Sequence, residues 1–551
     1  MRVLFTNKLL LPMVMNRAVL LLLFVCVQHV VLSQTNRYMV FFTDKTNSPY
    51  SIDRPLEFLS QKAIDRNNRA TVSIEDLPVN PSYVAELNAL GISILYTSKW
   101  MNAALVEATL TQLESLNLPY VNSYEYIAPG TKPISNGRVE SGEKLDNSNG
   151  RTELIFNQNE VLHVPKMHAD GFIGTGIRIA VLDGGFSGID NNVYLKHAFD
   201  ENRILMTFDM VRKSTYVYDY TTHGANVFSI FGAFVEGSYI GGGYGANFDL
   251  YVTEDVSSEY RVEEYNWLIA AEKADSAGVD IISTSLGYYH FDDSSMDYII
   301  DNLDGSTAII SQAVELAFSK GMLIITSAGN QGKDSFWNRI TFPADANNVL
   351  AVGAVWDNDL LKADFSSLGP TADGRIKPDV MAVGGGTTYI NSASVITTGN
   401  GTSYSAPLIT GLAAGLWQKY PELTNIELKK IILESGNNYD TPNNDYGYGI
   451  PSYIRASNIR EGVLVGIDSG NRDKLIIYPN PVNGRFVNVM LKERLLNASI
   501  EIVNIHGQKI IKQAISNSDH LTIDVSNIHE GLYFVRISDE NSVEQMSLII
   551  E

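Results

Sequence analysis

The middle of the chain, residues 157–460, alternates short apolar runs with longer stretches of helical periodicity. Runs typical of buried strands lie at Ile177–Leu182, Ile281–Thr284, Met322–Ser327 and Val349–Ala354. Apolar residues recur at helical spacing over Glu263–Ala277, Thr307–Lys320 and Ser405–Lys419. Strands that alternate with helices favour parallel pairing, because each parallel connection needs a crossover. The pattern therefore predicts an α/β fold with a parallel sheet covered by helices on both faces.

The region before it, residues 34–128, mixes both patterns within a shorter span. Strand-like runs lie at Tyr38–Phe42, Ile92–Tyr96 and Ala103–Val106, and helix-like runs at Pro55–Arg66, Tyr83–Leu90 and Leu110–Leu116. This arrangement predicts a small α+β unit. A polar stretch rich in Gly, Asn and Ser follows and predicts a linker over residues 129–156.

The end of the chain, residues 474–551, alternates apolar and polar residues in short runs that turn residues separate. The clearest runs lie at Phe486–Leu491, Ile500–Ile505, Leu521–Val525 and Gly531–Ile537. Alternation with period two is typical of strands with one buried face. The pattern predicts a C-terminal β-sandwich, joined to the middle region by a linker over residues 461–473.

Residues 1–33 carry a short apolar run, Ala18–Val27, with Arg17 before it and Val31-Leu32-Ser33 after it. A positive flank, a short apolar core and a small residue at the end match an export signal that is cleaved after this segment. A membrane anchor is the alternative, but Gln28 and His29 interrupt the run before the ~20 apolar residues that a span needs. We therefore predict a removed signal peptide and no membrane span.

Composition and charge narrow the classes of function. The 551 residues are 45% hydrophobic and 19% charged, a mix that can bury a large core and argues against general disorder. The 41 basic and 62 acidic side chains give a net charge of −21, which disfavours nucleic acid and anionic membranes as partners. The single cysteine, Cys26, excludes an intramolecular disulfide, a cysteine-based zinc site and an iron–sulfur cluster.

Ser403 is the most specific candidate for a nucleophile. It lies in the segment TTGNGTSYSAPLITGL and just before the predicted helix Ser405–Lys419. A hydroxyl at a helix N-terminus lies in a field that favours developing negative charge. Gly401 allows a substrate backbone to approach, and Pro407 is expected in the first turn, where its missing N–H costs nothing. The alternative is a plain N-cap serine.

Asp183 and His223 are the candidates for the acid and the base. Asp183 falls at the C-terminal end of an apolar strand, where α/β sheets place functional groups. A turn or helix-cap aspartate is the alternative. His223 precedes Gly224 and an apolar run, which predicts that a buried helix begins there, although a lone histidine is more often structural.

The order Asp183, His223, Ser403 and the strings around these residues resemble the subtilisin-like serine peptidases, or subtilases. The resemblance covers most of residues 157–460. Two more strings are similar to family segments: Thr284-Ser285-Leu286-Gly287 to the segment that pairs with an extended substrate, and Ser327-Ala328-Gly329-Asn330 to the oxyanion segment. The resemblance implies substrate contacts by Ser285, Leu286, Gly287, Ala328 and Gly329, and a side-chain donor to the oxyanion at Asn330.

The resemblance implies a serine endopeptidase that hydrolyses peptide bonds in proteins through an acyl-enzyme on Ser403. His223 would take the proton from Ser403, and Asp183 would orient the imidazole. The chain departs from the family pattern at three places. Ala225 stands where Thr or Ser commonly follows His-Gly, and Phe228 occupies a usually small position. Gly184-Gly185 follows Asp183 where Ser or Thr and then Gly is frequent. They remove no catalytic atom, but they leave the cleavage preference open.

A catalytically inactive subtilase fold used for surface binding is the alternative function. The complete set Asp183, His223, Asn330 and Ser403 argues against it. No cofactor is required for the implied chemistry. Calcium is common in the family, but Asp301–Gly305 lacks the spacing of an EF-hand loop and is more typical of a surface turn, so we assign no metal ligands.

The flanking regions resemble parts of a secreted precursor. Residues 34–128 resemble a subtilase propeptide, which assists folding and covers the cleft; a binding domain that stays attached is the alternative. We expect maturation between Val121 and Gly150. The strings Tyr478-Pro479-Asn480-Pro481, Ile505-His506-Gly507-Gln508 and Gly531-Leu532-Tyr533-Phe534-Val535 resemble the C-terminal sorting domain of type IX secretion in Bacteroidetes. A generic ligand-binding β-sandwich is the alternative.

The expected partners are therefore protein or peptide substrates, the chain's own propeptide and an outer-membrane secretion machinery. The expected location is outside the cell or at its surface, reached through the periplasm and the outer membrane.

Overall fold

The computed structural model describes residues 34–66, 72–130, 155–462, 475–478, 480–482, 484–495, 498–504, 508–515, 518–538 and 543–550. The predicted signal peptide and most of both predicted linkers lie outside these residues. The chain divides into two compact units, Met1–Glu461 and Gly462–Glu551, which are described separately.

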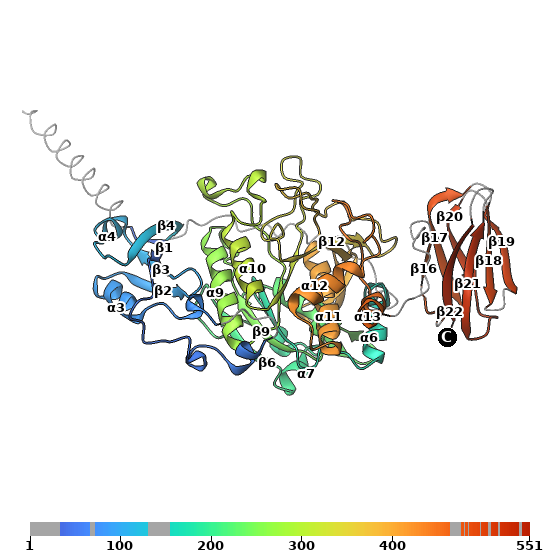
Figure 1. Cartoon of the computed structure of the whole chain (residues 1–551), viewed down its shortest axis with the longest axis horizontal. Helices are drawn as coiled ribbons and strands as arrows, with labels where there is room; N and C mark the ends of the chain where they lie inside the picture. Colours follow the sequence, from blue (N-terminus) through green and yellow to red (C-terminus); the bar gives the residue numbers. More distant parts are fainter. Residues whose placement is uncertain are drawn as a thin grey trace, which may run out of the picture. The chain divides into compact units, whose positions relative to one another are not determined.

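A seven-stranded parallel sheet forms the centre of the larger unit (Figure 1). Its strands follow the order β13-β12-β11-β10-β5-β9-β6, and every neighbouring pair is parallel. They are β5 (Arg178–Asp183), β6 (Ile204–Asp209), β9 (Asn247–Val252), β10 (Ile281–Thr284), β11 (Leu323–Ser327), β12 (Leu350–Trp356) and β13 (Val380–Gly385). The central strands are buried along their length, as expected for a parallel sheet with both faces covered.

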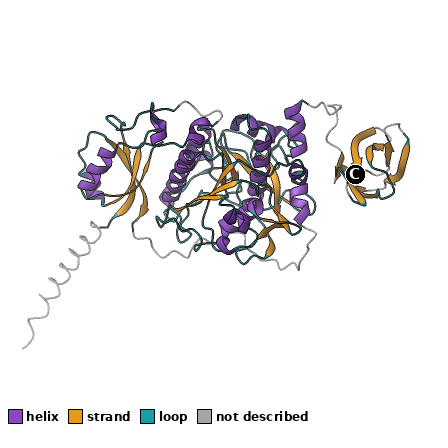
Figure 2. Ribbon diagram, turned by 90° about the horizontal axis from the view of Figure 1, so that it is seen from below, coloured by secondary structure: helices purple, strands orange, loops and turns teal. Residues whose placement is uncertain are grey.

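Helices cover both faces of this sheet (Figure 2). Helices α8 (His223–Gly232) and α11 (Thr402–Lys419) pack together, and α11 lies along β10 to β13. Helices α9 (Val262–Ala277) and α10 (Ile309–Ser319) pack together and contact β5 and β11 respectively. The predicted α/β fold is confirmed. The other helices of at least five residues in this region are α5 (Ile155–Glu160), α6 (Val164–Ala169), α7 (Lys196–Asp200), α12 (Asn425–Glu434) and α13 (Tyr453–Glu461).

Helix α11 begins at Thr402 and not at Ser405, and the prediction that Pro407 lies in its first turn is wrong. Pro407 lies inside the helix, where its missing N–H leaves the Ser403 carbonyl without a helical donor. The Ser285 hydroxyl donates to that carbonyl at 3.0 Å. Ser285, which directly follows β10, therefore supplies the hydrogen bond to the Ser403 carbonyl that Pro407 cannot donate.

The α+β region is built on a four-stranded antiparallel sheet with the order β2-β3-β1-β4. The strands are β1 (Asn36–Phe42), β2 (Ser93–Ser98), β3 (Ala103–Ala108) and β4 (Val121–Pro129), and the helices are α2 (Gln61–Asp65), α3 (Pro81–Ala89) and α4 (Leu110–Glu114). Strand β4 was not predicted. The predicted helix Pro55–Arg66 is split into η1 (Pro55–Glu57) and α2, because Ser60 caps α2 by accepting a hydrogen bond from the Ala63 N–H.

Helix α9 carries two acidic side chains that the α+β region buries. The Lys99 ammonium lies 2.7 Å from the Asp275 carboxylate, and the Arg66 guanidinium lies 3.1 Å from it. Glu272 accepts hydrogen bonds from the Ser98 hydroxyl at 2.5 Å and from the Lys99 N–H at 2.9 Å. Both regions contribute residues to one continuous hydrophobic core. The α+β region is therefore docked on α9 by buried ionic and apolar contacts together.

The smaller unit consists of two antiparallel sheets. One has the order β16-β17-β20 and the other the order β19-β18-β21-β22. Their inner faces share one core, which includes Val489, Ile523, Ile500 and Val535. The strands are β16 (Leu475–Tyr478), β17 (Phe486–Leu495), β18 (Ala498–Asn504), β19 (Lys509–Ile515), β20 (Ser518–Asp524), β21 (Gly531–Ser538) and β22 (Val543–Ile550).

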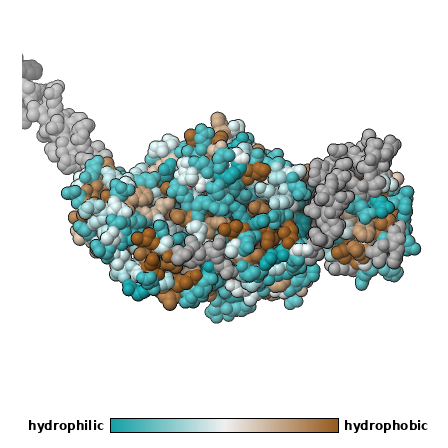
Figure 3. Space-filling view, in the orientation of Figure 1, coloured by the Kyte–Doolittle hydropathy of each residue, from teal (hydrophilic) through white to brown (hydrophobic). Residues whose placement is uncertain are grey.

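The surface shows where the remaining apolar residues lie. On the face drawn in Figure 3, hydrophilic residues dominate the larger unit, and its hydrophobic residues gather in separate groups and not in one continuous band. Within the described ranges, the structure contains no helix that is both long and apolar enough to cross a membrane. The apolar run Ala18–Val27 lies outside those ranges.

Candidate active site

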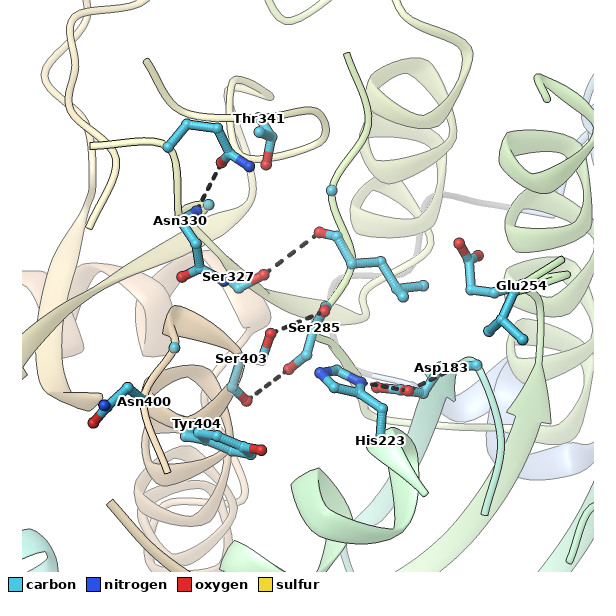
Figure 4. A pocket seen from close by; sticks show the side chains of 17 residues that line it. Asp183, His223, Glu254, Ser285, Ser327, Asn330, Thr341, Asn400, Ser403 and Tyr404 are labelled. Carbon is cyan, nitrogen blue, oxygen red and sulfur yellow. Dashed lines mark hydrogen bonds and ion pairs between the residues drawn. The ribbon is translucent and has the colours of Figure 1, made fainter. Parts of the chain in front are cut away.

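The candidate residues meet at the carboxyl edge of the parallel sheet. Asp183 is the last residue of β5, β10 leads into Ser285, and β11 leads towards Asn330. These three strands are neighbours in the sheet, so their ends lie side by side. Helices α8 and α11 bring His223 and Ser403 to the same edge. All five side chains line one cleft (Figure 4).

The Asp183 carboxylate holds the His223 ring in place. His223 Nδ1 lies 2.8 Å from Asp183 Oδ1, which also accepts the Gly184 N–H at 2.7 Å. Asp183 is fully buried. Gly224 makes this approach possible, because a Cβ atom there would lie 2.9 Å from Asp183 Cβ. An N–H at Nδ1 leaves Nε2 of the neutral ring as the acceptor, which is the tautomer that a general base needs.

Ser403 lies in the first turn of α11, on the other side of the His223 ring from Asp183 (Figure 4). Its hydroxyl donates to the Ser285 carbonyl at 3.3 Å, a longer contact than the 2.7–2.8 Å typical of a hydroxyl donor. This bond is weak, so the hydroxyl can turn away from the carbonyl at little cost. In the first helical turn, the Thr402 N–H donates to Asn330 Oδ1 and the Tyr404 N–H to the Gly401 carbonyl. The helix start still provides a field that favours developing negative charge beside Ser403.

The Asn330 amide is oriented by Thr402. The Thr402 N–H and hydroxyl donate to Asn330 Oδ1 at 2.8 and 2.9 Å. Because Oδ1 accepts both bonds, the amide NH2 group is left to donate to another oxygen. Gly401 lies beside the amide, where a Cβ atom would be in ordinary van der Waals contact with Asn330 Nδ2 at 3.6 Å.

Four of the five residues predicted to contact substrate line the cleft, namely Ser285, Leu286, Gly287 and Gly329. Ala328, the fifth, is fully buried and does not line it. The cleft has a volume of about 120 Å³. That is roughly ten times the space that one water molecule needs, so the cleft can admit peptide side chains.

Phe228, at a position that is usually small in the family, is fully buried in α8. Its ring packs edge-on against Phe248, with the ring centres 4.8 Å apart. Gly232, one helical turn later, leaves room for it, because a Cβ atom there would collide with the Phe228 ring. The larger side chain is accommodated in the core and takes no space from the cleft.

Glu254 is a cleft residue that the sequence analysis missed. It follows β9, and its position just beyond the end of a parallel strand is the signal that could have found it. The Tyr288 hydroxyl donates to Glu254 Oε1 at 2.5 Å. Burial raises the pKa of Tyr288 well above its ordinary value, and the Glu254 charge adds to the effect.

Glu254, Glu259 and Glu263 have carboxylate oxygens within 4.8 Å of one another. Oxygen ligands suit a hard cation such as Ca²⁺. However, Glu254 accepts hydrogen bonds from two hydroxyls, and Glu263 accepts the Asp255 N–H at 3.0 Å, so hydrogen bonds alone account for part of the cluster. We assign no metal to it. In the predicted turn Asp301–Gly305, Asp304 accepts the N–H groups of Ser306 and Thr307.

Thr341 and Gln331 also line the cleft and were not predicted. Gln331 directly follows the oxyanion segment, which is a local signal for its position. Thr341 directly precedes Phe342-Pro343, and nothing in its neighbourhood in the sequence points to the cleft.

Comparison with known families divides the chain into three matching regions. Residues 174–449 match the subtilase family. Residues 37–142 match the peptidase S8 propeptide domain of Bacteroidota, and residues 476–551 match the secretion system C-terminal sorting domain. The sorting-domain match implies that the protein is secreted.

Curated relatives match the same middle region. Serine protease AprX of Bacillus subtilis (strain 168) is 30% identical over 329 residues, which cover 54% of this chain and 70% of that protein. Subtilisin DY of Bacillus licheniformis is 26% identical over 278 residues, covering 50% and 90%. Subtilisin E of Bacillus subtilis (strain 168) is 29% identical over 291 residues, covering 52% and 68%. With the family match spanning half of the chain, this protein belongs to the subtilase family of serine endopeptidases.

Proposed function

We propose that Asp183, His223 and Ser403 form the catalytic triad of this protease and that Asn330 binds the oxyanion. The observation that carries the proposal is the 2.8 Å contact between His223 Nδ1 and Asp183 Oδ1, in a cleft that Ser403 also lines. In the reaction, His223 Nε2 takes the proton of the Ser403 hydroxyl as its oxygen attacks a peptide carbonyl carbon. Asp183 stabilises the imidazolium that forms, and His223 then gives the proton to the leaving amine.

The negative charge that develops on the carbonyl oxygen is met by two donors, the Asn330 amide and the Ser403 N–H. Thr402 fixes the rotation of the amide, and the start of α11 supplies a favourable helix dipole. Donors that are already in place need no reorganisation during the reaction, which is why such groups contribute strongly to catalysis. The acyl-enzyme on Ser403 is then hydrolysed by water through the same groups.

A fluorophosphonate probe tests the roles of these residues. We expect the processed protein to be labelled at Ser403, and the Ser403→Ala and His223→Ala variants to lose the label. Ser405→Ala is the matched control, because Ser405 lies in the same helix but is buried and bonded to the Thr402 carbonyl. Absence of label on the processed wild-type protein would support the alternative of an inactive binding fold.

We further infer that the α+β region acts as an inhibitory propeptide that the protease itself removes. Its buried contacts with Asp275 and Glu272 of α9 support docking, and the propeptide match supports the role. The Ser403→Ala variant should accumulate as an uncleaved precursor. Normal processing of that variant would mean that another protease acts on the precursor, or that the region stays attached as a binding domain.

We infer that the C-terminal unit directs passage across the outer membrane, so that the enzyme is released or held at the cell surface. The sorting-domain match supports this inference. Deletion of Lys474–Glu551 should trap the protein in the periplasm, while the Ser403→Ala variant of the full chain should still leave it. Unchanged secretion of the truncated chain would contradict the inference.

The proposed chemistry requires no cofactor, because side chains provide the nucleophile, the base and the oxyanion donors. Calcium binding stays a separate prediction without assigned ligands. Dialysis against a chelator followed by a thermal melt tests it. A lower melting temperature that added Ca²⁺ restores would indicate a structural calcium site.

A further inference from the structure

Helix α11 lacks one internal hydrogen bond in its first turn, at the residue that we propose as the nucleophile. Pro407 has no N–H, so the Ser403 carbonyl has no donor from the helix. The Ser285 hydroxyl donates to this carbonyl at 3.0 Å instead. Ser285 directly follows β10 and is only 5% exposed. The main chain of Ser403 is therefore held by the end of a sheet strand and not by its own helix.

A second hydrogen bond joins the same two residues in the opposite direction (Figure 4). The Ser403 hydroxyl donates to the Ser285 carbonyl at 3.3 Å. This longer bond is lost when the Ser403 side chain turns towards His223. The 3.0 Å bond ends on the main chain of Ser403, so rotation of the side chain does not break it. The Ser285 hydroxyl can therefore hold Ser403 in place while the Ser403 hydroxyl moves.

The two residues before Ser403 are held by other strands of the same sheet. The Gly401 N–H donates to the Gly384 carbonyl of β13 at 2.8 Å. The Thr402 hydroxyl accepts the N–H of Gly329, in the segment that follows β11, at 3.2 Å. Together with the bond from the end of β10 to Ser403, each of three successive residues is bonded to a different strand or strand end. The start of α11 is therefore positioned by the sheet.

A deeper contact joins the same helix to the same strand. Thr410 Oγ1 of α11 lies 2.9 Å from Ser283 Oγ of β10. Both residues are fully buried. Thr410 follows Ser403 by about two helical turns, so this contact does not reach the nucleophile. It provides a natural comparison, because it also links α11 to β10 through a hydroxyl.

We propose that Ser285 is a positioning residue, whose hydroxyl holds the Ser403 main chain where its side chain can reach His223. The inference rests on the proposed role of Ser403 as the nucleophile. An N–H from the helix would fix Ser403 relative to α11 alone. The Ser285 hydroxyl fixes it relative to β10, and the neighbouring strand β5 ends at Asp183, which holds the His223 ring. Misplacement of a reacting group by about 1 Å can cost about 10²-fold in rate, so such a bond matters for catalysis.

Ser285→Ala tests the proposal at a temperature where the processed enzyme stays folded. We expect kcat to fall about tenfold with KM unchanged, because the variant keeps the main chain of the segment that is predicted to contact substrate. Thr410→Val is the matched control: it removes the deeper hydroxyl contact and should lower stability but leave kcat within about twofold of wild type. A kcat of Ser285→Ala equal to that of Thr410→Val would overturn the proposal.

Pro407→Ala separates the effect on catalysis from the effect on stability. In the double variant Ser285→Ala/Pro407→Ala, the new N–H can bond the Ser403 carbonyl, so the midpoint of urea unfolding should return to that of Pro407→Ala. Its kcat should stay about tenfold below that of Pro407→Ala, because a helix N–H does not link Ser403 to β10. A merely structural role of Ser285 predicts that both recover together, and that result would refute the proposal. The double variant also carries the test if Ser285→Ala alone does not fold.

Titration of Ser403 with a fluorophosphonate gives kcat per active site and separates this inference from the proposed function. Wild-type enzyme that is labelled, with an equal kcat in Ser285→Ala, overturns only the role of Ser285. Wild-type enzyme that is neither labelled nor active on peptides overturns the proposed catalytic residues as well.

Discussion

Replacement of Asp275 by Asn should release the propeptide from the processed enzyme without damage to catalysis. Asp275 belongs to α9 and is fully buried, where it pairs with Lys99 and Arg66 of the α+β region. Asn keeps the size of the side chain but removes the negative charge. The two cations, with exposed fractions of 10% and 2%, would then stay buried beside a neutral group.

The size of the effect follows from the burial of this group. Removal of one partner from a buried ion pair costs about 3–5 kcal/mol, because the remaining charge is left uncompensated. Such a loss would raise the dissociation constant of the propeptide by about 10²- to 10⁴-fold. The neighbouring Glu272 carboxylate still offers some compensation, so we expect the lower part of this range.

Lys62→Met provides the matched control at the same interface. Lys62 pairs with Asp280 at 2.5 Å, but its side chain is 44% exposed. The Asp280 side chain is 12% exposed, but it keeps the Arg178 N–H at 2.8 Å when Lys62 is replaced. Loss of this half-exposed pair should cost about 1 kcal/mol, so the dissociation constant should rise by about fivefold.

The assay is dilution of the processed protein, with recovered peptidase activity as the measure of propeptide dissociation. Gel filtration at each concentration shows how much propeptide is still bound. Equal, small effects of Asp275→Asn and Lys62→Met would refute the reasoning, because they would show that burial does not set the strength of these pairs.

Three further predictions concern the cleft and the core. Asn330→Ala should lower kcat about 10²- to 10³-fold with little change in KM, the magnitude established for the oxyanion donor in subtilisin. Thr402→Val should lower kcat only a few-fold, because the Thr402 N–H still holds the amide. Ser285→Ala should lower stability by about 1–3 kcal/mol, measured by urea unfolding, and by less in a Pro407→Ala background, where the helix carbonyl regains an N–H donor. Burial raises the pKa of Glu264 from 4.5 to about 7. The neutral Glu264 side chain therefore contributes fully to stability below pH 4.5, and this contribution is lost as the pH rises to 7. In Glu264→Gln the midpoint of urea unfolding should lose this pH dependence.

The catalytic edge could be predicted because local signals and topology agree there. The strand at Ile281–Thr284 was predicted with the bounds that the structure has, and Asp183 ends its strand as expected. Neighbouring parallel strands have their carboxyl ends at the same edge of the sheet. Once the strands are predicted, the segments that follow them are therefore also predicted to lie close together. The start of the His223 helix followed from an apolar run after glycine.

The errors lie where a distant contact outweighs the local pattern. Helix α11 begins directly after Gly401, three residues before the predicted start at Ser405. The helix tolerates Pro407 because the Ser285 hydroxyl supplies the missing hydrogen-bond donor. Strand β4 alternates polar and aromatic residues without a continuous apolar run, and its pairing with β1 defines it. Such partners are far apart in the sequence, so no local window contains them.

Two different kinds of contact bring residues to the cleft in this fold. The proposed catalytic residues follow strand ends and helix starts, so the order of the strands in the sheet brings them together. Thr341 reaches the cleft only because its segment bonds to Ala328 on one side and the next residue bonds to Tyr288 on the other. A change in that crossing segment would alter the cleft beside Thr341 and leave the Asp183–His223 pair untouched. Sequence motifs therefore identify the reaction, whereas a residue such as Thr341 comes to the cleft only through packing across it.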